Sequence, residues 1–155
     1  MDKKLGVYIC EGCGIGESLD IAALKKVGTK EFKAPVCKSH PWLCGAEGLE
    51  MIKADMTGEG VNTLCLVACS PRVKTNEFDF GPVLMDRVNV REHVAWVLPA
   101  GDEDTQMMGE DQLRLGLIKL QKSTPPEPYQ AENLSKTVLV VGGGFAGMNA
   151  ALGAA

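Results

Sequence analysis

The segment NTLCLVAC, residues 62–69, is a continuous apolar run with the length of one β-strand. Such a run is typical of a parallel strand that is buried on both faces of a sheet. The segment KLGVYIC, residues 4–10, has the same character, and FKAPVC, residues 32–37, is a further strand candidate. Helical patterns separate and follow these segments, so the alternation predicts an α/β fold with a small parallel sheet.

Three helices are expected around this sheet. Residues 18–28 suit a short helix with Ser18 as N-cap and Gly28 as its stop. Residues 45–60 and residues 103–123 suit two longer amphipathic helices. The side chains expected to face the core share helical spacing, and they are Leu49, Ile52 and Met56 in the first and Leu113, Leu117 and Leu120 in the second.

The composition narrows the class of protein. The chain has 155 residues, of which 45% are hydrophobic, and its formal net charge is −4. This balance fits one globular domain with part of a second and argues against a nucleic-acid partner, which would require a basic face. No segment approaches the roughly 20 apolar residues of a membrane span, and the N-terminal apolar stretch is too short for a signal peptide. We therefore expect a cytoplasmic protein without a direct membrane span.

A second structural unit is indicated near the C-terminus. Residues 137–155, TVLVVGGGFAGMNAALGAA, read as a strand, a glycine-rich turn and a helix of small residues. In a dinucleotide-binding fold Gly142 makes the tight turn, Gly144 admits the pyrophosphate, and Gly147 allows close packing of helix on strand. The predicted domains are a cysteine-rich α/β domain over 1–122, a proline-rich linker over 123–136, and the truncated start of a Rossmann-type domain over 137–155.

Six cysteines invite a chemical explanation, because cytoplasmic thiols stay reduced. Cys10 and Cys69 stand at the carboxyl ends of expected parallel strands, and Cys44 opens an expected helix. Ligands bind at that edge of α/β sheets, so these three are expected to converge with Cys13. Four thiolates suit an iron–sulfur cluster or a structural zinc equally well. Cys65 is expected to be a small core residue, and the role of Cys37 stays open.

Two other functions remain open from the residues. Cys10 and Cys13 form a Cys-x-x-Cys pair, which a thiol–disulfide oxidoreductase would use as a dithiol. A non-enzymatic interaction domain would leave all six thiols packed and inert. Other residue types suggest ordinary roles, with His40 and His93 structural or at the surface, Met107 and Met108 in the core, and Arg72 either beside an anionic cluster or simply exposed.

Several motifs carry a family resemblance over essentially the whole chain. In order they are GVYICEGCGIG, HPWLCGAEGLEMIK, VACSPR, VNVREHVAW, DEDTQMM and VLVVGGGFAG. They resemble the N-terminal part of the heterodisulfide reductase A family. Within it they most resemble the second flavoprotein, of the B type, in the quinone-interacting membrane-bound oxidoreductase.

The resemblance implies an oxidoreductase subunit of anaerobic metabolism that transfers electrons between a [4Fe–4S] cluster, FAD and partner subunits. As a fragment it is not expected to be active alone. Any membrane association would come through partner subunits, and a homo-oligomer stays open. Family cysteines match Cys10, Cys44 and Cys69, whereas Cys13 or Cys37 completes the ligand set, because the Cys10-x-x-Cys13 spacing and Val94 depart from archaeal members. The FAD fingerprint matches Gly142, Gly143, Gly144, Phe145, Ala146 and Gly147.

Overall fold

The computed structural model describes residues 2–125, 127 and 129–155. They fall into two units, the first ending at residue 125 and the second running to residue 155. Within the described residues, no helix combines the length and the apolar character needed to cross a membrane.

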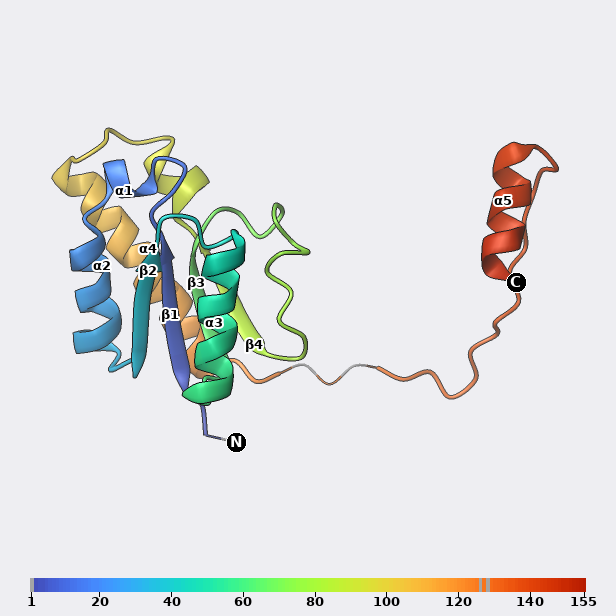
Figure 1. Ribbon diagram of the computed structural model, residues 1–155, viewed down its shortest axis with the longest axis horizontal. Coiled ribbons are helices and arrows are strands. Elements are labelled where there is room, and N and C mark those ends of the chain that lie inside the picture. The colour runs from blue at the N-terminus through green and yellow to red at the C-terminus, as the bar shows by residue number, and fades with distance from the viewer. Residues whose placement is uncertain (1, 126, 128) are drawn as a thin grey trace. The chain divides into compact units, whose positions relative to one another are not determined.

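Four parallel strands form the centre of the first unit, in the spatial order β2-β1-β3-β4 (Figure 1). Their bounds are β1 Leu5–Cys10, β2 Val36–His40, β3 Thr63–Ala68 and β4 Leu84–Asn89. Every residue of β3 is buried, as expected of a strand with neighbours on both sides and helices on both faces. The predicted α/β class with a small parallel sheet is confirmed.

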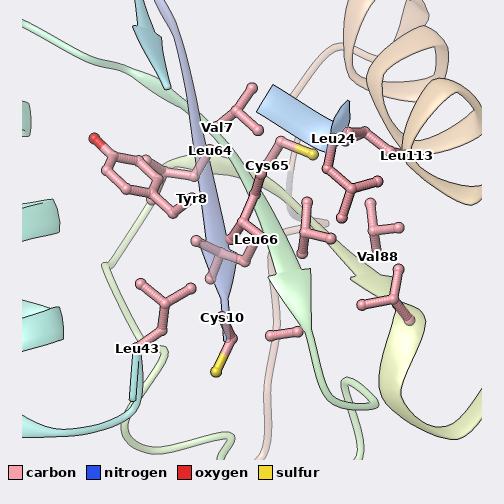
Figure 2. Packing of buried hydrophobic residues seen from close by; sticks show 14 of the residues in the cluster. Val7, Tyr8, Cys10, Leu24, Leu43, Leu64, Cys65, Leu66, Val88 and Leu113 are labelled. Atoms are coloured by element: carbon pink, nitrogen blue, oxygen red, sulfur yellow. The ribbon is translucent and has the colours of Figure 1, made fainter. Parts of the chain in front are cut away.

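Helices cover both faces of this sheet. On one face α3, Ala46–Gly58, packs over the side chain of Tyr8, while α2, Ile21–Lys26, and α4, Glu103–Lys122, pack over the other (Figure 2). The predicted α4 stripe of Leu113, Leu117 and Leu120 is fully buried or nearly so. The remaining short helical segments are α1, Ile15–Ser18, and two π-helical turns, η1 at Val27–Glu31 and η2 at Arg91–Ala95.

The first helical region differs from the prediction. Ser18 ends α1 instead of capping the next helix, and its buried hydroxyl lies 3.4 Å from the Ala95 carbonyl oxygen. The cap of α2 is Asp20, whose carboxylate accepts hydrogen bonds from the N–H groups of the second and third helical residues. Gly28 does not stop the helix, because the π-helical turn runs through it.

The sheet and α4 also contain differences. β2 lies about four residues later than expected, after Pro35, which has no N–H to donate to a ladder. β4 was not predicted, because its sequence LMDRVN mixes polar and apolar residues as an edge strand does. Met107 and Met108 are 55% and 44% exposed and are therefore not core residues, because they lie off the buried stripe of α4.

The second unit contains α5, Phe145–Ala154, with Gly144 at its N-cap. Residues 137–141 do not form the expected strand. A strand needs a neighbour to accept its backbone hydrogen bonds, and the described residues of this unit provide none. Residues 126 and 128 of the predicted linker lie outside the described residues.

Candidate metal centre

The carboxyl edge of the sheet holds the candidate site, at the point where the strand order reverses. The chain passes from β1 to β2 on one side and then returns to β3 on the other side of β1. Ligands of open α/β sheets bind in the crevice at such a switch point. Cys10 is the last residue of β1, and Cys69 follows the last residue of β3.

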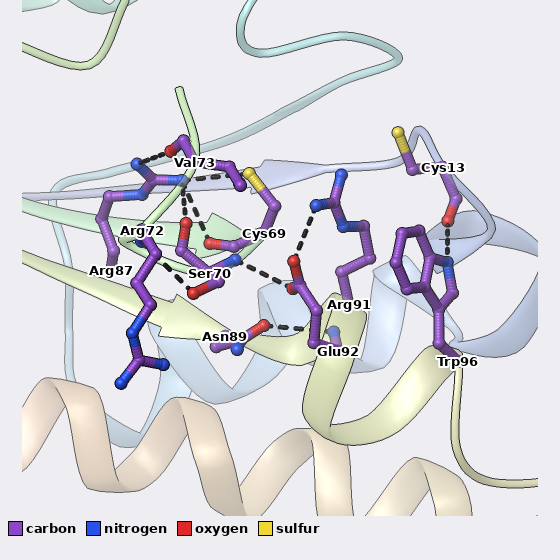
Figure 3. A network of polar contacts seen from close by, with 10 residues as sticks. All are labelled: Cys13, Cys69, Ser70, Arg72, Val73, Arg87, Asn89, Arg91, Glu92 and Trp96. Carbon is purple, nitrogen blue, oxygen red and sulfur yellow. Dashed lines mark hydrogen bonds and ion pairs between the residues drawn. The ribbon is translucent and has the colours of Figure 1, made fainter. Parts of the chain in front are cut away.

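Two loops bring further cysteines toward this edge. Cys13 follows β1 and has a positive φ of 57°, and it is succeeded by Gly14 with φ 88°. The indole N–H of Trp96 donates to the Cys13 carbonyl oxygen over 2.8 Å and holds this loop against η2 (Figure 3). Cys44 directly precedes Gly45, the N-cap of α3, and lies in the loop anchored by the fully buried Leu43.

The electrostatics link these thiols to one another. Burial raises the pKa of the Cys10 thiol, and hydrogen bonds from the backbone N–H groups of Leu43 and Gly12 partly offset that rise. Charge on Cys44 or on Cys13 raises the pKa of Cys10 further, as neighbouring thiolates would. We name four residues the cysteine site: Cys10, Cys13, Cys44 and Cys69.

The other two cysteines lie elsewhere. Cys37 is paired in register with Val7, three residues before the end of β1, and its thiol lies near the carbonyl oxygen of Lys25. Cys65 is paired with the same Val7 from β3 and is completely buried, as predicted. Burial raises the pKa of each of these thiols. Both therefore belong to the packed face beneath α2 and α4 and not to the edge.

Basic side chains surround the cysteine site. Arg87 of β4 donates to the Cys69 thiol over 3.0 Å, and Arg91 of η2 lies beside Cys13 and near Cys69 (Figure 3). A hydrogen bond to Glu77 is the main cause of the raised pKa of Lys74, and charge on Cys44 and Cys69 adds to it. These three cations were not singled out from the sequence.

The cation proposed from the sequence lies differently. Arg72 is exposed, and Figure 3 shows its guanidinium directed away from Cys69. His93 is also exposed, and the Nδ1 atom of His40 accepts a hydrogen bond from the Trp42 N–H, so neither histidine is held toward a shared metal. The strand that carries Arg87 has no clear apolar pattern, which is why this residue could not be placed at the site beforehand.

The donor chemistry fits a sulfur-ligated cluster. Within residues 2–125, 127 and 129–155, no three His, Cys, Asp or Glu side chains already form a coordination group for a single ion. The thiols do meet N–H donors, and the Nε atoms of Arg87 and Arg91 are buried without a hydrogen-bond partner. Hydrogen bonds to sulfur and nearby positive charge are the features that stabilise an anionic iron–sulfur cluster.

The glycine-rich turn of the second unit forms the other candidate site. Gly142 has a φ of 106°, a conformation that side chains rarely adopt, and a Cβ on Gly147 would collide with the Gly142 carbonyl oxygen. Both glycines are therefore required by the backbone of this turn. The turn leads directly into α5 at Phe145.

Comparison with known proteins identifies relatives along nearly the whole chain. No protein-family model matches. The chain is 30% identical to the A subunit of the H(2):CoB-CoM heterodisulfide,ferredoxin reductase of Methanothermobacter marburgensis, over 97% of this chain and 24% of that protein. It is 29% identical to the A subunit of the ferredoxin:CoB-CoM heterodisulfide reductase of Methanosarcina mazei, over 96% and 20%. It is 26% identical to the iron-sulfur A subunit of the CoB–CoM heterodisulfide reductase of Methanocaldococcus jannaschii, over 98% and 24%.

The chain thus spans between a fifth and a quarter of the length of these relatives. Their names describe reductase subunits, and one name specifies an iron-sulfur subunit. The expected likeness to an oxidoreductase component of the heterodisulfide reductase A type is confirmed. The narrower likeness to the B-type flavoprotein of the quinone-interacting oxidoreductase stays a prediction.

Proposed function

We propose that the first unit is an electron-transfer module of a heterodisulfide-reductase-A-like oxidoreductase, and that the cysteine site holds a [4Fe–4S] cluster. The observation that carries this proposal is the gathering of four thiols from separate segments at the switch point of the sheet. A bound cluster would supply one-electron storage. Its electrons would be exchanged with a flavin and with partner subunits.

The fourth ligand is assigned by position. Cys13 lies in the loop that follows Cys10, and its charge acts on the Cys10 thiol. Cys37 is three positions earlier along the sheet, at the level of Val7. We therefore propose Cys13 as the fourth ligand and Cys37 as a packed thiol.

The residues of the site would stabilise the cluster in two ways. Backbone N–H groups at Gly12 and Leu43 donate toward the Cys10 sulfur, and the guanidinium of Arg87 donates toward the Cys69 sulfur. Cys10 and Cys69 are each less than 10% exposed, so the site limits access of water to the sulfurs. Burial, hydrogen bonding and charge are the means by which proteins set the potential of such clusters.

Thiol–disulfide exchange is less well supported. A reactive Cys-x-x-Cys pair depends on a thiol with a lowered pKa, whereas burial raises the pKa of Cys10. A dithiol enzyme also has no need for Cys44 and Cys69 at the same edge.

The second unit is proposed as the first part of an FAD site. Residues 142–147 would place their backbone at the pyrophosphate, because Gly142, Gly143 and Gly144 carry no side chains and Phe145, Ala146 and Gly147 begin the helix. The assignment of residues 123–136 as the linker between two domains is likewise a proposal.

Metal analysis tests the cluster. Protein prepared without oxygen is expected to contain about four iron and four sulfide per chain, with broad absorbance in the visible range. Replacing any residue of the cysteine site by Ala should lower the iron content, while Cys37→Ala and Cys65→Ala serve as matched controls that keep it. Circular dichroism of each variant verifies that it is folded.

Two results would contradict this assignment. Stoichiometric zinc in place of iron would show a structural metal site instead of an electron-transfer centre. Iron lost in Cys37→Ala but retained in Cys13→Ala would exchange the roles of these two residues.

A further inference from the structure

Three cations lie around the cysteine site, and they differ in how their charge is balanced. Lys74 pairs with Glu77 over 2.8 Å, and Arg91 pairs with Glu92 over 2.6 Å. Arg87 forms no ion pair with a carboxylate within the described part of the chain. Arg87 is therefore the cation whose charge no neighbouring carboxylate cancels.

The guanidinium of Arg87 is fixed in place by the segment that follows β3. Its Nη2 atom donates to the carbonyl oxygens of Cys69 and Ser70 over 3.1 and 2.9 Å, and Nη1 donates to that of Val73 over 2.8 Å (Figure 3). The phenyl ring of Phe78 lies 4.5 Å from the guanidinium carbon. These contacts leave the group little freedom to turn toward solvent.

A half-buried cation of this kind needs a counter-charge. Carbonyl dipoles orient the guanidinium but do not neutralise it, and an uncompensated charge away from water is costly. Among the acceptors of Arg87, only the Cys69 sulfur can carry a negative charge, and it lies 3.0 Å from Nη2. The Nε atom is buried and has no partner, so a donor remains for a further acceptor.

We propose that Arg87 is the counter-charge of the cysteine site: it positions Cys69 and, with a cluster bound, favours the reduced, more negative form. Arg87 does not ligate the cluster and acts through Cys69. The effect on a cluster rests on the proposed function, whereas the uncancelled charge beside Cys69 does not depend on a bound metal.

Reduction potentials test the first consequence. In cluster-containing protein, Arg87→Gln is expected to lower the equilibrium constant for one-electron reduction about tenfold, which corresponds to about 59 mV. Arg87→Lys keeps the charge and should stay much closer to the unmodified protein. Lys74→Gln is the matched control, because Lys74 neighbours the same thiols but is paired with Glu77 and exposed. We expect it to leave the potential unchanged.

Alkylation of metal-free protein tests the charge without a cluster. The rates of Cys69 modification by anionic iodoacetate and neutral iodoacetamide are measured by mass spectrometry and expressed as a ratio. The ratio cancels differences in thiol exposure, because both reagents attack the same sulfur. It should fall several-fold in Arg87→Gln, while Arg87→Lys and Lys74→Gln retain it. Cys65 provides an internal reference within the same chain.

The outcomes separate the two proposals. An unmodified protein that binds no cluster would refute the proposed function, and the reagent ratio alone would then decide the role of Arg87. If Arg87→Gln keeps its cluster and its potential, or if Arg87→Lys is altered as much as Arg87→Gln, the counter-charge role is wrong. Loss of the cluster from Arg87→Gln supports the proposal only if the reagent ratio also falls, and an unchanged ratio overturns it.

Discussion

Tyr8 shows how one side chain connects the sheet to α3. It is completely buried, and its hydroxyl donates to the Asp55 carboxylate over 3.2 Å. Lys38 donates to the other oxygen of Asp55 over 2.6 Å, so the carboxylate has two donors. This group satisfies the polar atoms beneath α3 and joins β1, β2 and the helix.

The pH dependence of folding should report this tyrosine. Burial, and then the negative charge of Asp55, raise the pKa of Tyr8 above its ordinary value of about 10. A raised folded pKa gives stability that is complete below pH ~10 and lost as the pH rises further. Tyr8→Phe should cost about 1 kcal/mol at pH 7, and the gap to the unmodified protein should narrow near pH 11. Urea unfolding at both pH values measures it, and a constant gap would contradict the assignment.

The site shows residue by residue what the sequence could predict. Cys10 and Cys69 could be placed at one edge because each ends an apolar strand pattern, and parallel strands share that edge. The partner cation could not be found in the same way. Its strand lacks a clear pattern, and Arg72, which stands close to Cys69 in sequence, is directed away from it.

Among the elements, α2 illustrates how close alternatives compete for a helix cap. Ser18 and Asp20 are both good N-cap residues, and only tertiary contacts decide between them. Ser18 is drawn into the structure beside the Ala95 carbonyl oxygen, which leaves Asp20 to accept from the N–H groups of Ala22 and Ala23. Local sequence preferences cannot contain that information.

Removing the cap tests this arrangement. Asp20→Ala is expected to lower the free energy of unfolding by about 1 kcal/mol, because two N–H groups at the start of α2 lose their acceptor. Asp20→Asn keeps an acceptor oxygen and should recover most of the loss. Chemical denaturation of the three proteins provides the measurement. Equal stability of Asp20→Ala and the unmodified protein would show that the cap contributes nothing.

The packing of α4 on the sheet leads to a prediction with an unusual sign. Replacing glycine by alanine inside a helix ordinarily stabilises it by about 0.5–1 kcal/mol. At Gly116, however, an added Cβ would overlap the Val88 side chain and lie 3.1 Å from the Asp86 carboxylate. Gly116→Ala should therefore destabilise the protein by about 1–3 kcal/mol. Gly58→Ala is the control, since nothing lies within 4 Å of that position. Thermal unfolding of Gly116→Ala at or above the unmodified midpoint would show that the helix moves freely.

For the molecule as a whole, prediction succeeds where burial is complete within the chain. The strands at residues 5–10 and 63–68 and the core face of α4 follow from apolar patterns that the first unit satisfies internally. Residues 137–141 have an equally strong strand pattern but no strand to pair with, and side chains such as Val138, Leu139 and Val141 are largely exposed. Pattern alone gives a preference, whereas pairing makes a strand.

The last prediction concerns the stability of the whole first unit. The proposed ligands come from the end of β1, from the loops before α1 and α3, and from the end of β3, so a bound cluster would tie together segments up to 59 residues apart, from Cys10 to Cys69. A group that binds only the folded chain stabilises it by mass action. Removing iron under anaerobic, reducing conditions should therefore lower the thermal unfolding midpoint while leaving the helix signal at low temperature largely intact, because the core lies beneath the helices and not at the cysteine edge. Circular dichroism melts of cluster-containing and iron-free protein measure both quantities, with Cys69→Ala expected to match the iron-free state. Identical midpoints would mean that these thiols do not jointly hold a metal group in the folded protein.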